Sequence, residues 1–330
     1  MTSGRISIRL VVSLGALVIA ATLAAAQMPS PARLLVLLRD GSALAIVDPA
    51  AGKVLGRVPT LKGPHEVTVS ADGKLAFVAN QGTSIAVIDV AAQKELRRVE
   101  VGPQSQPHDV HFAGGKVYFT AEGWKTIGRY DPASDKIDWL LGTGDTPHMV
   151  VLSKDMNTMF TANRISNRVS VIEGVSAGPP KWQVTAIPVP GKVPEGIDLS
   201  PDGREVWTAT RGDGGVSIID VASKKVTQTF NLGMKDANRL KFTPDGKLVL
   251  ISDEAGNSLV VLDAVARKEI KRLNMAPDAV LVHPDGSRAY AALRKDNSVA
   301  VIDLKTLEVT AHIPTGPDSG PGCMFWVEAR

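Results

Sequence analysis

Residues 64–101 read PHEVTVSADGKLAFVANQGTSIAVIDVAAQKELRRVEV and contain one complete repeat unit of this chain. Four short runs rich in β-branched residues are separated by turn residues, as at 71–73 and 81–83. Short apolar runs bounded by Gly, Asp or Asn are typical of β-strands joined by tight turns. Four strands in about forty residues is the length of one propeller blade. The stretch therefore predicts a four-stranded blade.

An acidic residue closes the third run of the unit, and this ending recurs along the chain. It falls at Asp48, Asp89, Asp131, Glu173, Asp220, Asp263 and Asp303. The spacings between these residues are 41, 42, 42, 47, 43 and 40. A nearly constant period of this size indicates a repeat architecture. The sequence thus predicts an all-β fold, a seven-bladed β-propeller with four strands in each blade.

The two ends of the repeat region indicate how the ring closes. Residues 34–38, 43–47 and 54–59 match the second, third and fourth strands of a unit, so the first unit lacks its innermost strand. Residues 321–327 match an innermost strand that has no unit of its own. We expect this C-terminal strand to complete the first blade beside residues 34–38, because closure removes the exposed edges of an open array.

The repeat also carries motifs of a known family. The segments FVAN at 77–80 and FTAN at 160–163, with Pro-Asp-Gly turns such as 201–203, resemble the YVTN-type repeat of bacterial seven-bladed β-propellers. The resemblance covers residues 34–327 and implies the propeller fold. It implies no single activity, since related propellers include ligand-binding, adhesive, lyase and electron-transfer proteins, and fold does not fix function.

The first residues have the order of a secretory signal peptide. Arg5 and Arg9 flank the start of an apolar run that ends in three alanines at 24–26, as in a charged region, an apolar region and a cleavage site. We interpret residues 1–26 as the signal peptide, 27–33 as a linker and 34–330 as a single propeller domain. A periplasmic or secreted location follows. An uncleaved membrane anchor is the alternative, although a span needs ~20 apolar residues.

Charge and cysteine content narrow the classes of partner. The net charge is +3, and removal of Arg5 and Arg9 leaves 35 basic and 34 acidic residues, or +1. This balance gives no support to nucleic-acid binding or to an anionic membrane surface. Cys323 is the single cysteine, so the chain cannot form an internal disulfide. We expect a monomer without a membrane span after signal removal, whose partner is a small-molecule or anionic ligand or a periplasmic protein.

One ring of equivalent positions carries most of the candidate chemistry. The innermost strands of a propeller line a central channel, and the residue after the opening Pro of the unit lies at one mouth. The seven units place there Gly322, His65, His108, His148, Glu195, Asn238 and Asp278. Imidazoles that converge with a carboxylate are ligands for Zn, Cu(II) or non-haem Fe. We predict one divalent metal at His65, His108 and His148, with Glu195 as fourth ligand or base.

Other roles for these histidines stay open. They can be hydrogen-bonded turn residues that join blades, or neutral imidazoles that act on an organic substrate as general base and donor. The next position in each unit holds Glu66, Asp109, Met149, Gly196, Arg239, Ala279 and Cys323. Its acids are candidates to orient the histidines or to bridge blades, and its sulfur atoms would favour copper if they faced inward. His111 is expected to lie between blades.

A second ring follows the second strand of each unit. It holds Arg39, Gln81, Glu122, Arg164, Arg211, Glu254 and Arg294. Four arginines can form a positive rim that binds a carboxylate or phosphate through paired hydrogen bonds, with solvated loop charge as the alternative. Trp124 lies in a loop of the same face and either walls a pocket or caps the third blade. Asn238, Arg239 and Asp278 complete the candidate ligand contacts.

Together these patterns predict binding of a metal ion or small ligand at the channel mouth. Metal-assisted catalysis would use Cu, Zn or Fe to polarise an oxygen or activate water, with Glu195 or Glu66 moving the proton. The alternative is a non-catalytic scaffold of the periplasm or cell surface that holds a protein or polymer. The sequence has no nucleophile elbow, phosphate-binding loop or Cys-x-x-Cys pair, so those chemistries receive no support.

Overall fold

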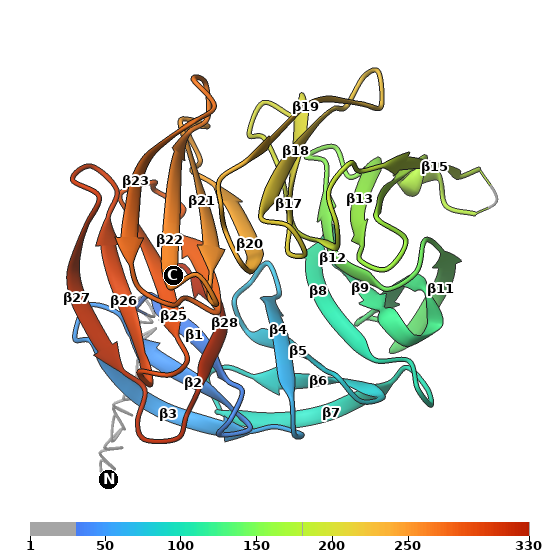
Figure 1. The fold of residues 1–330 in the computed structure, drawn as a ribbon. Coiled ribbons are helices and arrows are strands. Elements are labelled where there is room, and N and C mark those ends of the chain that lie inside the picture. The colour runs from blue at the N-terminus through green and yellow to red at the C-terminus, as the bar shows by residue number, and fades with distance from the viewer. Residues whose placement is uncertain (1–30, 180, 330) are drawn as a thin grey trace, which may run out of the picture.

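The computed structural model describes residues 31–179 and 181–329. In this part of the chain, seven four-stranded antiparallel sheets surround one axis (Figure 1). The predicted seven-bladed β-propeller is confirmed. The signal peptide predicted at 1–26, and residues 27–30 of the linker, lie outside the described residues. No helix of the described ranges has the length and apolar character to cross a membrane.

The strands occupy four concentric positions, from the channel outward. The innermost strands are β28 (Pro321–Val327), β4 (Pro64–Val69), β8 (Pro107–Ala113), β12 (Pro147–Leu152), β16 (Pro194–Leu199), β20 (Ala237–Phe242) and β24 (Ala279–Val282). The second strands are β1 (Arg33–Leu38), β5 (Leu75–Asn80), β9 (Lys116–Ala121), β13 (Thr158–Asn163), β17 (Glu205–Thr210), β21 (Leu248–Asp253) and β25 (Arg288–Leu293).

The remaining strands complete the blades. The third strands are β2 (Ala43–Asp48), β6 (Ser84–Asp89), β10 (Thr126–Asp131), β14 (Arg168–Glu173), β18 (Gly215–Asp220), β22 (Ser258–Asp263) and β26 (Ser298–Asp303). The outermost are β3 (Lys53–Pro59), β7 (Lys94–Glu100), β11 (Lys136–Gly142), β15 (Gln183–Pro188), β19 (Lys225–Asn231), β23 (Lys268–Asn274) and β27 (Glu308–Pro314). Short 3₁₀ helices follow β9 (η1, Glu122–Trp124) and β14 (η2, Val175–Ala177).

The chain ends close the ring as predicted. Strand β28 pairs antiparallel with β1, with Trp326 opposite Leu34 and Met324 opposite Val36. Figure 1 shows β28, in red, beside the blue first blade. On its other side β28 contacts β4 of the second blade. The C-terminal strand therefore fills the innermost place of the first blade, and no blade edge is left open between the two ends.

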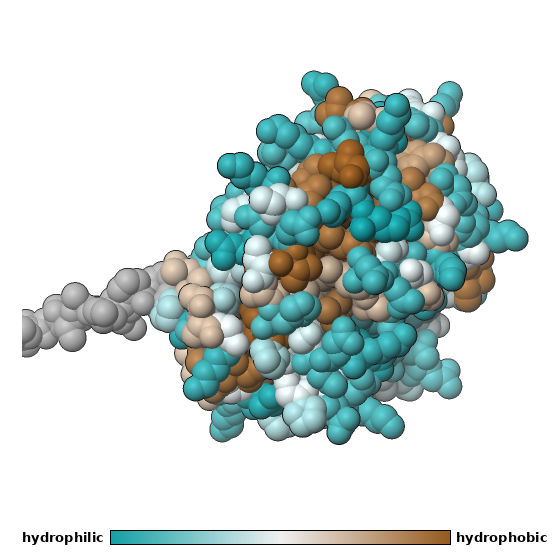
Figure 2. Space-filling model, turned by 60° about the vertical axis from the view of Figure 1, so that its left-hand side comes forward, coloured by the Kyte–Doolittle hydropathy of each residue, from teal (hydrophilic) through white to brown (hydrophobic). Residues whose placement is uncertain are grey.

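The core lies between neighbouring blades. The second and third strands are buried along nearly their whole length, whereas the outermost strands alternate exposed and partly buried residues. One apolar cluster, for example, joins Leu35 and Leu44 of the first blade to Val67 and Val78 of the second. This arrangement explains the apolar middle runs, because both faces of those strands are covered. On the surface, hydrophobic residues lie in patches interrupted by hydrophilic ones (Figure 2).

A recurrent turn fixes the mouth of the channel. The residue before the opening Pro has a positive φ at Gly63, Gln106, Thr146, Val193 and Gly320. The carbonyl of each accepts the backbone N–H of the rim residue of the same blade, at Gln81, Glu122, Arg164, Arg211 and Arg39, over 2.8 to 3.2 Å. Rim residues of these five blades are therefore held at one level. Thr146 and Val193 are β-branched and strained in this conformation.

Candidate functional site

The three predicted histidines meet at the channel mouth. Their side chains open β4, β8 and β12, and His65, His108 and His148 are only 7%, 0% and 2% exposed. The ring centroids of His65 and His108 are 3.8 Å apart and those of His108 and His148 are 3.7 Å apart, while the outer pair is separated by 6.3 Å. The rings therefore form a row with His108 at its centre, not a triangle around one point.

Hydrogen-bond donors and acceptors are poorly matched among the ring nitrogens of this row. The Nε2 atoms of His65 and His108 are 3.2 Å apart, and a guanidinium nitrogen of Arg39 also lies 3.2 Å from His65 Nε2. A guanidinium only donates, so His65 Nε2 must accept and the Nε2 of neutral His108 must carry the proton. His108 Nδ1 is then a buried acceptor without a partner. Within the described residues His65 Nδ1 makes no hydrogen bond, and His148 Nε2 contacts a Glu195 oxygen 3.1 Å away without hydrogen-bond geometry.

Burial keeps the first two imidazoles neutral. Loss of hydration lowers the pKa of His65 to about 4, although the neighbouring Glu66 carboxylate opposes the change. Burial also lowers the pKa of His108 well below its ordinary value, and the adjacent His148 and His65 act in the same direction. A neutral imidazole is the form that binds a metal ion.

Glu122 is a functional candidate that our sequence analysis placed on the rim without giving it a role. Its Oε1 lies 2.7 Å from His148 Nδ1. Glu122 begins η1, directly after β9, so a neighbouring blade supplies the acceptor that orients the His148 ring. The sequence indicates this contact only by position, because Glu122 occupies the rim of the blade that precedes the one carrying His148.

Glu195 sits among cations. Its carboxylate lies 3.1 Å from His148 Nε2, 3.2 Å from Arg164 Nε and 3.3 Å from an Arg211 nitrogen. Burial alone would raise the pKa of Glu195, but contact with His148 and the charges of Arg164 and Arg239 hold it well below its usual range. A carboxylate held in this way is a fixed anion and a weak proton acceptor near neutral pH.

A buried ion pair crosses the channel just inside the histidine row. An Arg239 nitrogen on β20 lies 2.5 Å from Glu66 Oε1 on β4, although the residues are 173 positions apart. Both side chains are only 6% exposed. Burial would raise the pKa of Glu66, but the Arg239 charge holds it well below its usual range. Glu66 Oε1 is also 3.6 Å from His65 Nδ1, so the pair contacts the histidine cluster.

Two overlapping sets of side chains have the chemistry of a metal site. One ligand atom from each of His65, Glu66 and His108 lies within 4.8 Å of the others, and the same holds for His108, Glu122 and His148. Nitrogen and carboxylate ligands suit Zn, Cu or Fe. The structure thus brings the three predicted histidines together but divides them between two sets that share His108.

The rim arginines are paired with carboxylates. Arg39 lies 2.8 Å from Asp278, and Arg294 lies 2.5 Å from Asp40. Arg211 pairs with Asp236 as well as with Glu195. The five mouth arginines, Arg39, Arg164, Arg211, Arg239 and Arg294, face six carboxylates, Asp40, Glu66, Glu122, Glu195, Asp236 and Asp278. The mouth is therefore a belt of alternating charge in which the arginines are already engaged.

The remaining predicted contacts join parts of the scaffold. Asn238 donates to the carbonyl of Asp278 in the next blade and accepts from the Ser252 hydroxyl. The Trp124 indole donates to the carbonyl of Pro103 and packs beside the core between the second and third blades. Of the two roles considered for Trp124, this position corresponds to capping.

A recess of 440 Å³ adjoins the site between the fourth and fifth blades. It is lined by Thr146, Arg164, Ile165, Asn167, Lys192 and Val193. Its walls include Thr146 and Val193, the two β-branched residues with positive φ. Ile165 is 71% exposed there, so the recess offers an apolar surface beside the Arg164 guanidinium.

Several neighbours of the histidines face a second cavity, deeper in the channel between the innermost strands, which we call the channel cavity. Asp109 accepts the backbone N–H groups of Val110 and Val150, and so bridges two blades. Met149 and Cys323 line the channel cavity. His111 also lines it and is exposed there, so the expectation that it lies between blades was wrong. Strand β8 shifts register between Pro107 and Val110, which turns His111 toward the channel.

Comparisons with known proteins agree with the propeller fold. YncE of Salmonella typhi, an uncharacterized protein, is 30% identical over 152 residues, which are 41% of this chain and 40% of YncE. The match thus spans less than half of that relative. Hydrazine synthase of Kuenenia stuttgartiensis has a TM-score of 0.69 at 22% identity, covering 82% of this chain and 94% of that chain.

A second solved structure agrees with the fold, and a family model identifies the family. The dihydro-heme d1 dehydrogenase NirN, in complex with DHE, has a TM-score of 0.65 at 14% identity and covers 89% of this chain and 74% of that one. At this identity the likeness concerns the fold alone. The model of the cytochrome D1 heme domain family matches residues 103–286, more than half of the chain. The chain therefore belongs to the cytochrome D1 heme domain family of β-propellers.

Proposed function

We propose that this protein binds a metal ion at the channel mouth through His65, His108 and His148. The observation that supports it is the row of buried imidazoles, in which the Nδ1 atoms of His65 and His108 make no hydrogen bond within the described residues. A buried polar atom without a partner costs about 1–3 kcal/mol. Coordination of an ion would give the lone pair of His108 Nδ1 the partner that it lacks, and His65 would take part in its other tautomer.

The charges around the row suit a cation better than an anion. The five mouth arginines are already paired with carboxylates, and the rim carries Glu254 as a further acid. Glu66 and Glu122 would complete the two ligand sets, with Glu195 as a fixed negative charge beside His148. The low pKa values of Glu66 and Glu195 make them charge partners, so the proposal covers binding and gives neither residue a proton-transfer role.

A haem-type ligand is the second candidate, and membership of the cytochrome D1 heme domain family favours it. Imidazole is a common axial ligand of haem iron, and buried neutral histidines at a mouth rimmed by arginines suit that donor chemistry. When bound, such a group would supply redox chemistry at its iron. The arginines would have to leave their present carboxylate partners to hold carboxylates of the ligand.

We also infer export to the periplasm or outside the cell. The signal-like order of residues 1–26 and the YVTN-like repeat motifs support this location. Detection of a mature chain that starts near Gln27 in a periplasmic fraction would test it. A full-length chain found only in the cytoplasm would contradict it.

Elemental analysis tests the metal proposal. The purified, tag-free protein is offered Zn, Cu, Fe and Mn, beside the variant His65→Gln/His108→Gln and the control His312→Gln, whose histidine is exposed on β27. We expect about one equivalent of metal in the wild type and the control, and none in a double variant that still melts cooperatively.

An absorption titration with haemin separates the second candidate. A histidine-dependent Soret shift without retained free metal would favour the haem-type ligand. Neither metal nor haemin bound would overturn both candidates and leave the mouth histidines as structural residues of an interaction scaffold.

A further inference from the structure

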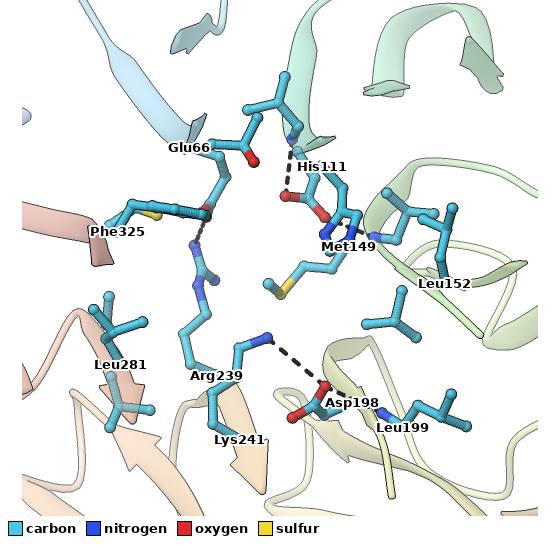
Figure 3. A pocket seen from close by; sticks show the side chains of 18 of the residues that line it. Glu66, His111, Met149, Leu152, Asp198, Leu199, Arg239, Lys241, Leu281 and Phe325 are labelled. Carbon is cyan, nitrogen blue, oxygen red and sulfur yellow. Dashed lines mark hydrogen bonds and ion pairs between the residues drawn. The ribbon is translucent and has the colours of Figure 1, made fainter. Parts of the chain in front are cut away.

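Beyond the Glu66–Arg239 pair, the channel contains a cavity of 330 Å³ (Figure 3). Alternate residues of each innermost strand point the same way, so the cavity wall is built in two layers. The layer nearer the histidines has Glu66, Asp109, Met149, Arg239, Ala279 and Cys323. The layer two residues further along has Thr68, His111, Val151, Asp198, Lys241, Leu281 and Phe325.

The cavity is separate from the histidine site. The Glu66–Arg239 pair lies between them, and both side chains are buried. At the other end the cavity reaches Ser200 and Pro201, which belong to the turn between the first and second strands of the fifth blade. It therefore extends toward the face of the propeller opposite the histidines.

The second layer has an apolar side and a polar side. Figure 3 shows Leu281 and Phe325 along one wall, and Lys241 with Asp198 along another. Leu281 and Phe325 are only partly buried, so they present apolar surface to the cavity. Pockets of about 300–1,000 Å³ with apolar walls and a few converging polar groups are typical of small-molecule sites.

The cation on the polar side, Lys241, makes only a loose ion pair within the described residues. Lys241 Nζ is 3.9 Å from Asp198 Oδ1, which is outside hydrogen-bond distance. Asp198 cannot easily turn toward it, because its two oxygens accept the backbone N–H groups of Leu199 and Phe242 at 3.1 and 2.9 Å. Asp198 thus bridges two blades and leaves the lysine donors available.

The other polar groups add little negative charge. The His111 ring takes part in no hydrogen bond within the described residues, and protein surrounds it although it is accessible from the cavity. That environment and the Lys241 charge lower its pKa to about 4, so it is a neutral donor or acceptor near pH 7. Both oxygens of Asp109 accept backbone N–H groups, from Val110 and Val150, which partly offset its charge.

We propose that this cavity binds a small carboxylate with an apolar body. The carboxylate would pair with Lys241 and accept a hydrogen bond from His111, while the body would cover Leu281 and Phe325. The site is distinct from the metal site and does not depend on it.

Calorimetric titration with phenylacetate tests the proposal, with the uncharged phenylacetamide as the matched probe. We expect saturable binding of the acid that is at least tenfold tighter than that of the amide. Lys241→Met should remove this preference, whereas Lys247→Met, on an exposed turn lysine, should leave it unchanged. Leu281→Trp should abolish binding of both probes by filling the cavity.

Metal content at the mouth should stay the same in all these variants, so failure of one proposal is distinguishable from failure of the other. Equal binding of acid and amide by the wild-type protein, or no saturable binding of the acid, would by itself overturn the proposed carboxylate site. Tight binding that persists in a folded Leu281→Trp protein would place the ligand elsewhere and would also overturn it.

Discussion

The channel mouth and the channel cavity are built by the same innermost strands, yet they balance charge in opposite ways. At the mouth, arginines and carboxylates pair with one another, and the Nδ1 atoms of His65 and His108 make no hydrogen bond within the described residues. In the second layer of the cavity, the carboxylate of Asp198 accepts backbone N–H groups, and Lys241 is only loosely paired with it at 3.9 Å. The first arrangement suits a cation bound by lone pairs, and the second suits an anion.

The boundary between the two regions is the Glu66–Arg239 pair. His65, Glu66 and Thr68 on β4 reach the mouth, the boundary and the cavity within four residues. A strand rises only about 3.3 Å per residue, so regions of different chemistry are stacked closely. The buried ion pair separates the two regions, because Glu66 holds the Arg239 charge on the mouth side and leaves Lys241 as the cation of the second layer.

Breaking the Glu66–Arg239 pair should have the largest effect on stability. Arg239→Met leaves the buried Glu66 carboxylate without its cation, and loss of one partner of a buried pair costs about 3–5 kcal/mol. We expect the free energy of unfolding, measured in urea, to fall by that amount. The control Arg98→Met breaks an exposed pair with Glu95 and should cost at most about 1 kcal/mol. A loss as small as the control's would show that the boundary pair is not structural.

A fall in pH should change the free energy of unfolding with opposite sign through the two regions. His65 has a folded pKa of about 4 against about 6.5 when unfolded, so the unfolded chain binds more protons and stability falls as pH drops from 6.5 to 4. Asp109 has a folded pKa of about 7, above its unfolded value, so the folded chain binds more protons. The stability that Asp109 contributes in its protonated form is therefore lost as pH rises toward 7.

Denaturation between pH 4 and 7 measures both contributions. His65→Asn should make the free energy of unfolding rise less steeply with pH, and Asp109→Asn should make it rise more steeply, each by about 1 kcal/mol per pH unit at most. Identical slopes in wild type and both variants would contradict the burial of these groups.

Removal of the negative charge beside His148 should weaken metal binding at the mouth alone. Partners that hold a ligating histidine commonly contribute 10- to 100-fold in metal affinity, and Glu122→Gln removes the charge 2.7 Å from His148 Nδ1. We expect a loss in that range in a chelator competition, with carboxylate binding in the cavity unchanged. Glu100→Gln, on an exposed outer strand, is the control. An unchanged affinity would leave Glu122 without a role at the metal.

The smallest effect is expected at the strained turns of the mouth. A non-glycine residue in the left-handed region costs about 1–2 kcal/mol, and Val193 has φ +56° where equivalent turns have Gly63 and Gly320. Val193→Gly should therefore raise the melting temperature by a few degrees, even after the entropic cost of glycine. Val193→Ala keeps a Cβ and should give no gain. A lower melting temperature for the glycine variant would show that packing of Val193 outweighs the strain.

The sequence by itself determined the blades, their number and the closure of the ring. Turn residues, strand patterning and the acidic ending after each third strand recur at one period, and the unpaired strand at 321–327 had one vacant place to fill beside residues 34–38. The same phase argument brought His65, His108 and His148 to one mouth, because equivalent positions of a repeat lie at the same height along the axis.

Only the tertiary structure decided how those side chains meet. The repeat phase gives the height of a residue, but it does not give the direction of a side chain across the channel. The histidines therefore form a row, Arg239 reaches Glu66 from a blade 173 residues away, and His111 turns inward at a register shift of β8. These contacts depend on distances between blades that are remote in the chain, and local spacing contains no measure of such distances.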